Sequence, residues 1–315
     1  MKNKFLRKAA ALTAVLCLLP GLAGCVDQHP EETKPSSAET QQTETPRRLI
    51  ATSSATMAIC DRLGLELVAT CDTAGEIPQR YQGLPEVGTA MAPDAEKIIM
   101  QDPTDVIGPD TLAESIQSKY DAAHVPYTFI DLQSVQGMYD SIAMLGEKYG
   151  VQEAANELIA EYERIMADFR QEIQGKDSPR VLVLMGLPGA YIECTPNSYV
   201  GSMVELAGGE SVVQDAALNF VSWNTEQLLE LDPDVILLTA HGMPEAAMEM
   251  FQKEFASNDI WKHFRAVQEG RVYRLDYDLF NMSATFDWPQ ALEEMKEILY
   301  EGTFEAFPGL PESAD

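Results

Sequence analysis

The sequence AEKIIMQDPTDVIGP (residues 95–109) has a close counterpart 130 residues later, TEQLLELDPDVILLT (residues 225–239). The two stretches align without a gap, and each has a Glu, two aliphatic residues, a Pro seven positions after the Glu, and then a short apolar run. A helix that ends before a proline and is followed by a buried strand forms one αβ unit. The repeat therefore predicts two similar α/β lobes.

The sequence around both stretches alternates between strand and helix patterns. In the first lobe we expect strands at 48–52, 65–70, 105–108 and 127–131, and helices at 55–63, 94–101 and 111–123. In the second we expect strands at 180–185, 190–194, 234–239 and 271–276, and helices at 199–207, 224–231, 244–256 and 289–300. This alternation is typical of mainly parallel sheets covered on both faces.

Between the lobes, apolar residues at helical spacing predict one helix over residues 151–174, with a length of about 36 Å. The predicted fold class is therefore α/β, with two similar Rossmann-like lobes of mainly parallel sheet joined by one long α-helix. We expect the ligand in the cleft between the lobes, at the carboxyl ends of the strands. The predicted boundaries are 47–150 and 176–302 for the lobes, 151–175 for the linking helix, and 303–315 for a C-terminal tail.

Residues 1–24 have the pattern of an export signal, with a basic start and an apolar core too short to span a bilayer. Leu22-Ala23-Gly24 precedes Cys25 and resembles the bacterial lipoprotein signal, in which the Cys becomes the lipidated, palmitate-bearing first residue. An ordinary secretory signal is the alternative. Residues 25–46 then comprise the lipidated Cys and a polar, disordered tether with a reach of roughly 25 Å. We expect a lipid-anchored protein on the extracytoplasmic face of the cell membrane.

The net charge of the chain narrows the classes of partner, and its cysteines bear on disulfides and metal sites. The chain carries 50 acidic and 22 basic residues, and four of the basic ones leave with the signal, which takes the formal net charge from −28 to −32. Nucleic acid is a poor partner for such a surface. Cys60, Cys71 and Cys194 remain in the globular part without metal-type spacing, and three unpaired thiols are favoured over a Cys60–Cys71 disulfide.

A histidine and a methionine stand out at strand-to-helix corners. His241 follows the apolar strand that begins at Val235, and Pro244 opens the next helix at a favoured position. In the first lobe, Met91 lies in a loop before Pro93, which we expect to open a helix in the same way. A thioether facing an imidazole is a known axial pair for haem iron. Purely structural roles for both side chains are the alternative.

A third feature is TSSATM (residues 52–57), between the first strand and the first helix. Hydroxyl groups and free N–H groups at a helix start can bind an anion, and a plain serine N-cap is the alternative. If the ligand is haem, its propionates would be held on this side through neutral donors. The residues concerned are Thr52, Ser53, Ser54, Ala55 and Thr56.

Three stretches resemble the haem-receptor lipoproteins of iron-regulated surface determinant importers. They are RYQGLPEVGTAMAPDAE (80–96), VLVLMGLPGAYIECTPNSYVGSMVELAGGESVV (181–213) and HGMPEAAMEMFQKEFASNDIWKHFRAV (241–267). The resemblance implies the two-lobed periplasmic-binding-protein fold with a helical backbone, and Met91 and His241 as the axial ligands of haem b iron. One departure is Ala74-Gly75, where the resemblance implies a Tyr–Lys pair beside the propionates.

The resemblance also implies partners. A monomeric receptor of this kind would deliver haem to an ABC permease and its ATPase, and could take it from upstream surface haem-donor proteins. Glu114 and Glu245, with Glu96 and Glu226 second, are the candidates for docking on permease arginines.

Other ligands and other activities remain as alternatives. A ferric-siderophore or corrinoid receptor would share the fold, and Arg80, Arg265, Arg271 and Arg274 are the nearest candidates for binding an anionic chelate. A receptor for free Zn²⁺ or Mn²⁺ needs about three or four converging ligands, and the four scattered histidines do not supply them. The G-x-S-x-G, H-E-x-x-H, P-loop and G-x-G-x-x-G motifs do not occur, which favours a binding protein over an enzyme, with a secreted haem-degrading enzyme as the alternative.

Overall fold

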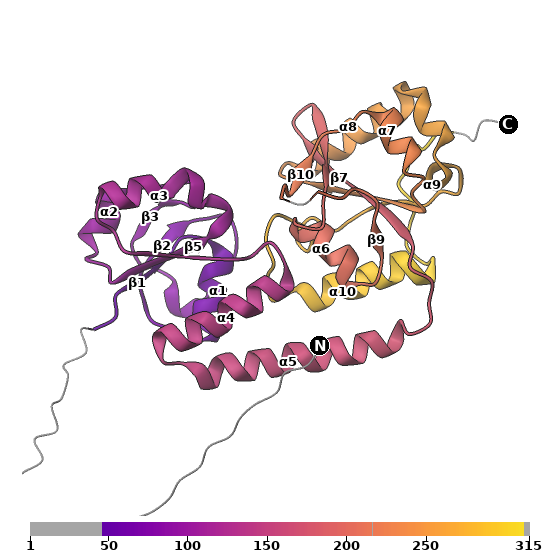
Figure 1. The fold of residues 1–315 in the computed structure, drawn as a ribbon. Helices are drawn as coiled ribbons and strands as arrows, with labels where there is room; N and C mark the ends of the chain where they lie inside the picture. The colour runs from indigo at the N-terminus through magenta and orange to yellow at the C-terminus, as the bar shows by residue number, and fades with distance from the viewer. Residues whose placement is uncertain (1–45, 216, 312–315) are drawn as a thin grey trace, which may run out of the picture. The chain divides into compact units, whose positions relative to one another are not determined.

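A computed structural model describes residues 46–215 and 217–311. The first lobe is built on a six-stranded sheet with strand order β4-β3-β2-β1-β5-β6, in which all neighbours are parallel except β3 and β4 (Figure 1). The strands are β1 (Leu49–Ala51), β2 (Leu67–Asp72), β3 (Glu86–Thr89), β4 (Ala92–Pro93), β5 (Asp105–Pro109) and β6 (Tyr127–Ile130). The helices of this half are α1 (Ser54–Arg62), α2 (Ala95–Met100), α3 (Ala113–Ala122) and α4 (Val135–Tyr149), with short 3-10 turns η1 (Gln79–Tyr81) and η2 (Asp110–Leu112).

The second lobe has its own mixed sheet, in the order β10-β8-β7-β11-β12, with β9 paired to β7. The pairs of β7 with β9 and β11, and of β11 with β12, are parallel, whereas β8 is antiparallel to β7 and β10. The strands are β7 (Arg180–Leu187), β8 (Ala190–Cys194), β9 (Glu210–Ser211), β10 (Phe220–Val221), β11 (Val235–Ala240) and β12 (Val272–Arg274). The helical segments are α6 (Tyr199–Leu206), α7 (Thr225–Glu230), α8 (Pro244–Ser257), η3 (Asp259–His263), α9 (Arg265–Gln268), α10 (Trp288–Lys296) and η4 (Glu297–Glu301). The prediction of an α/β fold with two mainly parallel sheets is confirmed.

The internal repeat holds residue by residue. Helices α2 and α7 begin and end at corresponding positions, and each is capped by a side chain, Asp94 and Asn224, which accept N–H bonds from the first turn. After each helix one residue turns left-handed, Asp102 with φ 48° and Asp232 with φ 42°, before the proline and the buried strand. Aspartate tolerates this conformation better than most residues, so the repeated Asp-Pro pair ends the helix and starts the strand in both lobes.

The long linking helix is α5 (Gln152–Glu172), of 21 residues, as its apolar spacing predicts. The sequence analysis missed the helix before it, α4, which packs along α5 (Figure 1). Two glycines allow this arrangement. Gly150 ends α4 in the left-handed conformation with φ 65°, and a Cβ on Gly146 would lie only 2.6 Å from the Cβ of Ala155 in α5. The helices can therefore approach closely at that point.

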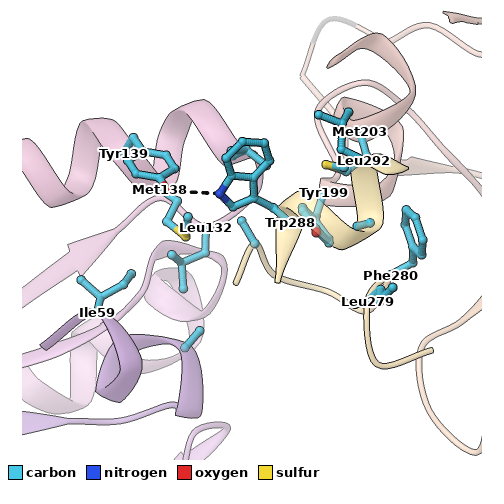
Figure 2. Packing of buried hydrophobic residues seen from close by; sticks show 14 of the residues in the cluster. Ile59, Leu132, Met138, Tyr139, Tyr199, Met203, Leu279, Phe280, Trp288 and Leu292 are labelled. Atoms are coloured by element: carbon cyan, nitrogen blue, oxygen red, sulfur yellow. Dashed lines mark hydrogen bonds between the residues drawn. The ribbon is translucent and has the colours of Figure 1, made fainter. Parts of the chain in front are cut away.

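The helices carry a buried aromatic cluster that joins the two halves of the chain (Figure 2). Trp288, at the start of α10, meets Tyr139 of α4 and Tyr162 of α5 at ring-centroid distances of 6.3 and 5.4 Å. Its indole N–H donates a hydrogen bond to the Tyr139 hydroxyl at 3.1 Å, and Tyr139 stacks on Tyr162. Such edge-on and stacked pairs contribute beyond the apolar area that they bury. The connection between the lobes is therefore packed rather than a loose hinge.

The helix start that was predicted at Pro93 is not observed. Pro93 does not open a helix, because it lies in β4 and Asp94 takes the capping position, so that prediction was wrong.

Cys60, Cys71 and Cys194 are free and buried, as the sequence favoured over a disulfide. Burial raises the pKa of Cys60 and Cys194 to about 12. Across the described residues, no helix is both long and apolar enough to cross a membrane. The predicted signal, Cys25 and the tether up to residue 45 lie outside the described residues.

Candidate functional site

Met91 lies at the tip of a two-residue turn between β3 and β4. Thr89 pairs with Ala92 across this hairpin, and the Ala92 N–H donates to the Thr89 hydroxyl at 3.2 Å. Gly88 has φ 96°, and a Cβ there would lie 2.7 Å from the Ala92 carbonyl oxygen, so this tight return needs glycine. The side chain of Met91 is 73% exposed. Since β3 runs parallel to β2, the Met91 thioether is presented at the carboxyl edge of the first sheet.

The start of α1 lies at the same edge, after β1. Ser53 caps the helix by accepting the Thr56 N–H at 3.1 Å, while the Thr56 hydroxyl accepts the Ser53 N–H at 3.0 Å. The Thr56 hydroxyl donates to the Ser53 carbonyl and the Thr52 hydroxyl to the Ile107 carbonyl, and both threonines are buried. The plain N-cap therefore accounts for most of these hydroxyl groups. The donors left for an anion are the Ser54 hydroxyl and the N–H groups of Ser54 and Ala55, which have no acceptor within a helix.

The Ala74-Gly75 departure lies beside this helix start. The Gly75 N–H donates to the Thr73 hydroxyl at 3.0 Å, and a Cβ on Gly75 would lie 3.0 Å from both Cβ and Oγ of Ser54. A larger side chain at position 75 would therefore press on Ser54. The small residue brings the loop after β2 close to the donors at the start of α1.

His241 lies at the corresponding edge of the second sheet. It follows the last residue of β11 directly, and its N–H donates to the Gly186 carbonyl of β7 at 3.1 Å. The His241 side chain is exposed. Pro244 occupies the first turn of α8, as predicted, and the residue before it, Met243, is left-handed with φ 46°. The corner therefore fixes the backbone of His241 in the sheet and leaves its imidazole accessible.

Polar contacts join the loop after β6 to the second lobe. Gln133 donates to the Asp110 carboxylate at 3.0 Å and accepts a hydrogen bond from the Asn219 side chain, while the Ser202 hydroxyl donates to the Gln133 carbonyl at 3.4 Å. Burial, together with the Asp131 carboxylate, raises the pKa of Asp110. These contacts border a cavity of about 350 Å³ lined by residues of both lobes, Asp131, Gln133, Ser134, Pro196, Asn197, Ala217 and Asn219.

Sequence reasoning missed this contact between the lobes. The only signal was polar residues following β6 at its carboxyl end, and nothing in the sequence paired Gln133 with Asn219.

The side chains that commonly bind bare metal ions are scattered over the described part of the chain. Within the described ranges, no group of three or more His, Cys, Asp or Glu side chains could hold a metal ion. Haem iron already has four porphyrin nitrogens, so one imidazole and one thioether complete its coordination. His124 and His263 are exposed at a helix-to-strand turn and in η3, and His29 lies outside the described residues.

Three of the four arginines considered for an anionic chelate are already ion-paired. Arg80 contacts Asp61 at 3.7 Å and also Glu66, Arg265 contacts Asp232 and Asp234, and Arg274 contacts Glu245 at 3.6 Å. These three guanidinium groups are therefore already paired with carboxylates of the protein.

The candidate docking residues lie at helix starts. Glu114 is exposed in the first turn of α3, and Glu245 is exposed in the first turn of α8 beside Arg274. Glu96 and Glu226 are exposed in the first turns of α2 and α7. Both exposed partners of the Glu245–Arg274 pair face solvent, so the pair adds little stability and leaves Glu245 available.

Known proteins share this architecture and much of the sequence. Residues 49–279 match the periplasmic binding protein family. The "High-affinity heme uptake system protein IsdE" of Staphylococcus aureus strain Newman is 36% identical over 258 residues, which cover 80% of this chain and 87% of that protein. A crystal structure of S. aureus IsdE complexed with heme has a TM-score of 0.76 at 36% identity, covering 81% of this chain and 100% of that one.

A second solved structure is similar to the same extent. The ABC transporter substrate-binding protein from Listeria monocytogenes EGD-e has a TM-score of 0.77 at 39% identity, covering 82% of this chain and 100% of that one. The resemblance drawn from the three sequence stretches is confirmed, because these relatives include a haem-uptake protein and match both lobes. The chain belongs to the periplasmic binding protein family and is homologous to IsdE, the S. aureus heme uptake protein.

Proposed function

We propose that this chain is the haem-binding component of an ABC importer and that His241 and Met91 are the axial ligands of the haem iron. The observation that carries the proposal is the placement of these two residues. Each is exposed at a tight corner at the carboxyl edge of its sheet, one on each lobe, in a chain homologous to a haem-uptake protein. This edge is where α/β proteins bind their ligands.

The two ligands have different roles. Ferric iron, the form expected outside the cell, favours the imidazole nitrogen, whereas the softer thioether suits the ferrous state and raises the reduction potential. His241 would therefore provide most of the retention of ferric haem. Met91 would close the sixth position and exclude water.

The propionates would be bound on the first lobe at the start of α1. Ser54 and Ala55 offer N–H groups where the helix dipole favours negative charge. Thr52, Ser53 and Thr56 shape this turn through their internal hydrogen bonds rather than by donating to the ligand. The small residues Ala74 and Gly75 leave these donors without the Tyr–Lys pair, so anchoring on this side would rest on the backbone.

The same proposal covers location and partners. Cys25 would be lipidated and residues 26–46 would tether the lobes to the extracytoplasmic face of the cell membrane. The loaded protein, acting as a monomer, would dock on an ABC permease through Glu114 and Glu245, and the permease's ATPase would drive uptake. Surface haem-donor proteins would be a source of haem for a receptor at this location.

Titration with haemin tests the proposal. The chain from residue 26 onward should bind one haemin, with a sharpened Soret band and the spectrum of six-coordinate low-spin iron. The His263→Ala variant, which changes an exposed histidine in η3, is the matched control and should titrate like the wild type. A featureless titration of the wild type would contradict the proposal.

A further inference from the structure

One backbone conformation in the His241 corner is unusual. In the part of the chain that the structure describes, four non-glycine residues have positive φ: Asp102, His124, Asp232 and Met243. The first three follow α2, α3 and α7 and are of types that tolerate the left-handed region at a helix end. Met243 differs on both counts, because it precedes a helix and its side chain cannot bond to its own backbone.

Methionine at position 243 supplies neither a cap hydrogen bond nor much buried apolar surface to the fold. Met243 is the N-cap of α8 but makes no side-chain cap hydrogen bond, where Ser, Thr, Asp or Asn would. Its side chain is 63% exposed, so it adds little to the core. Glycine would adopt φ 46° and ψ 61° without a steric penalty. Strained residues of this kind cluster where a ligand binds.

The strained turn places a large, exposed apolar residue close in sequence to the proposed iron ligand. Met243 is two residues from His241, and it is one of the six large apolar side chains that the described residues expose. Met91, the other proposed ligand, is another of the six. A flexible, polarisable thioether packs well against an aromatic face.

We propose that Met243 is a second contact of the second lobe with haem, packing on the porphyrin face beside the His241 imidazole. This inference rests on the proposed function. Met243 would contact the porphyrin and would not be an axial ligand, because His241 and Met91 would occupy both axial positions. Its contact would cover the edge of the imidazole, exclude water from the iron–nitrogen bond and so slow the loss of haem.

Two substitutions and a control test this role. Met243→Gly removes the contact and the strain together, so we expect the melting temperature of the haem-free protein to rise while haem leaves faster. Loss of a half-covered methionine contact corresponds to a dissociation rate roughly tenfold higher. The rate is measured by transfer of haem to excess apomyoglobin. Met100→Ala, which removes a methionine 79% exposed at the end of α2, is the matched control and should leave both quantities unchanged.

Met243→Leu separates packing from ligation. Leucine keeps the apolar volume without the sulfur, so most of the retention should be restored and the six-coordinate low-spin spectrum should be kept. The proposal is overturned if Met243→Gly releases haem at the wild-type rate, or if Met243→Leu releases it as fast as Met243→Gly. Failure of the wild type to bind haemin overturns the proposed function and this inference together, whereas wild-type binding with unchanged variants overturns this inference alone.

Discussion

Glu193 is a buried carboxyl group whose ionisation should lower the stability of the fold at neutral pH. This residue of β8 is fully buried, and one carboxylate oxygen accepts the Trp223 N–H at 2.9 Å. The other oxygen has no hydrogen-bond partner among the described residues. Burial raises the pKa of Glu193 from 4.5 to about 7, against the lowering effect of the Trp223 N–H. The folded protein therefore prefers Glu193 protonated, and neutral pH forces a buried charge on it.

The stability of the fold should therefore depend on pH through the Glu193 carboxyl group. Below pH 4.5 the group is protonated in both states and costs nothing. As the pH rises toward 7, the unfolded chain loses this proton first, so the free energy of unfolding falls. Each unit between the two pKa values corresponds to about 1.4 kcal/mol, which gives a loss on the order of 3 kcal/mol at pH 8.

Glu193→Gln removes the charge at nearly constant shape. We expect this variant to be more stable than the wild type by up to about 3 kcal/mol at pH 8, and by less than about 1 kcal/mol at pH 5. Urea denaturation of the haem-free proteins, followed by circular dichroism, measures both differences. Glu157→Gln, an exposed change on α5, is the matched control and should alter neither. A Glu193→Gln variant with the same advantage at both pH values, or with none, would refute the reasoning.

The remaining predictions concern the ligands, the anchor and the docking surface. His241→Ala should release ferric haem to apomyoglobin faster than Met91→Ala does, and the opposite order would show that His241 is not the dominant ligand. Cys25→Ala should release the protein from the membrane fraction, since the polar tether has no membrane affinity, and undiminished fractionation would contradict this. The double reversal Glu114→Lys/Glu245→Lys should impair haem uptake by cells without changing haem binding, whereas normal uptake would remove both residues as docking candidates.

Much of the fold could be predicted because the sequence repeats a unit whose ends are fixed by local chemistry. The Asp-Pro pairs at 102–103 and 232–233 lie between a helix and a buried strand in both lobes. The strand β11 and the proline-started helix α8 set the His241 corner in the same local way.

The missed elements depend on contacts that are distant in the sequence. Helix α4 contains Gly137 and Gly146, which lower helix propensity, although its buried residues Met138, Ile142 and Leu145 recur at helical spacing and could have revealed it. The strand β4 has two residues and exists only through its pairing with β3, so no periodicity could show it.

The candidate site was only partly predictable from the sequence. A hydroxyl-rich helix start has the same sequence pattern whether its side chains cap the helix or bind an anion. Only the hydrogen bonds of Ser53 and Thr56 show which hydroxyl and N–H groups are already bonded within the protein. The strain at Met243 is likewise invisible in the sequence, because Gly242 beside it is the residue expected to take a positive φ.

The absorption spectrum of the ferric haem complex, compared between the wild type, Met91→Ala and His241→Ala, tests the assignment of the two ligands most directly. We predict a six-coordinate low-spin spectrum for the wild type. Met91→Ala should still bind haem, with water or no ligand in the vacated position, and His241→Ala should lose the low-spin spectrum together with most of its haem. A wild-type spectrum in both variants would contradict the account, because haem would then be held by other residues.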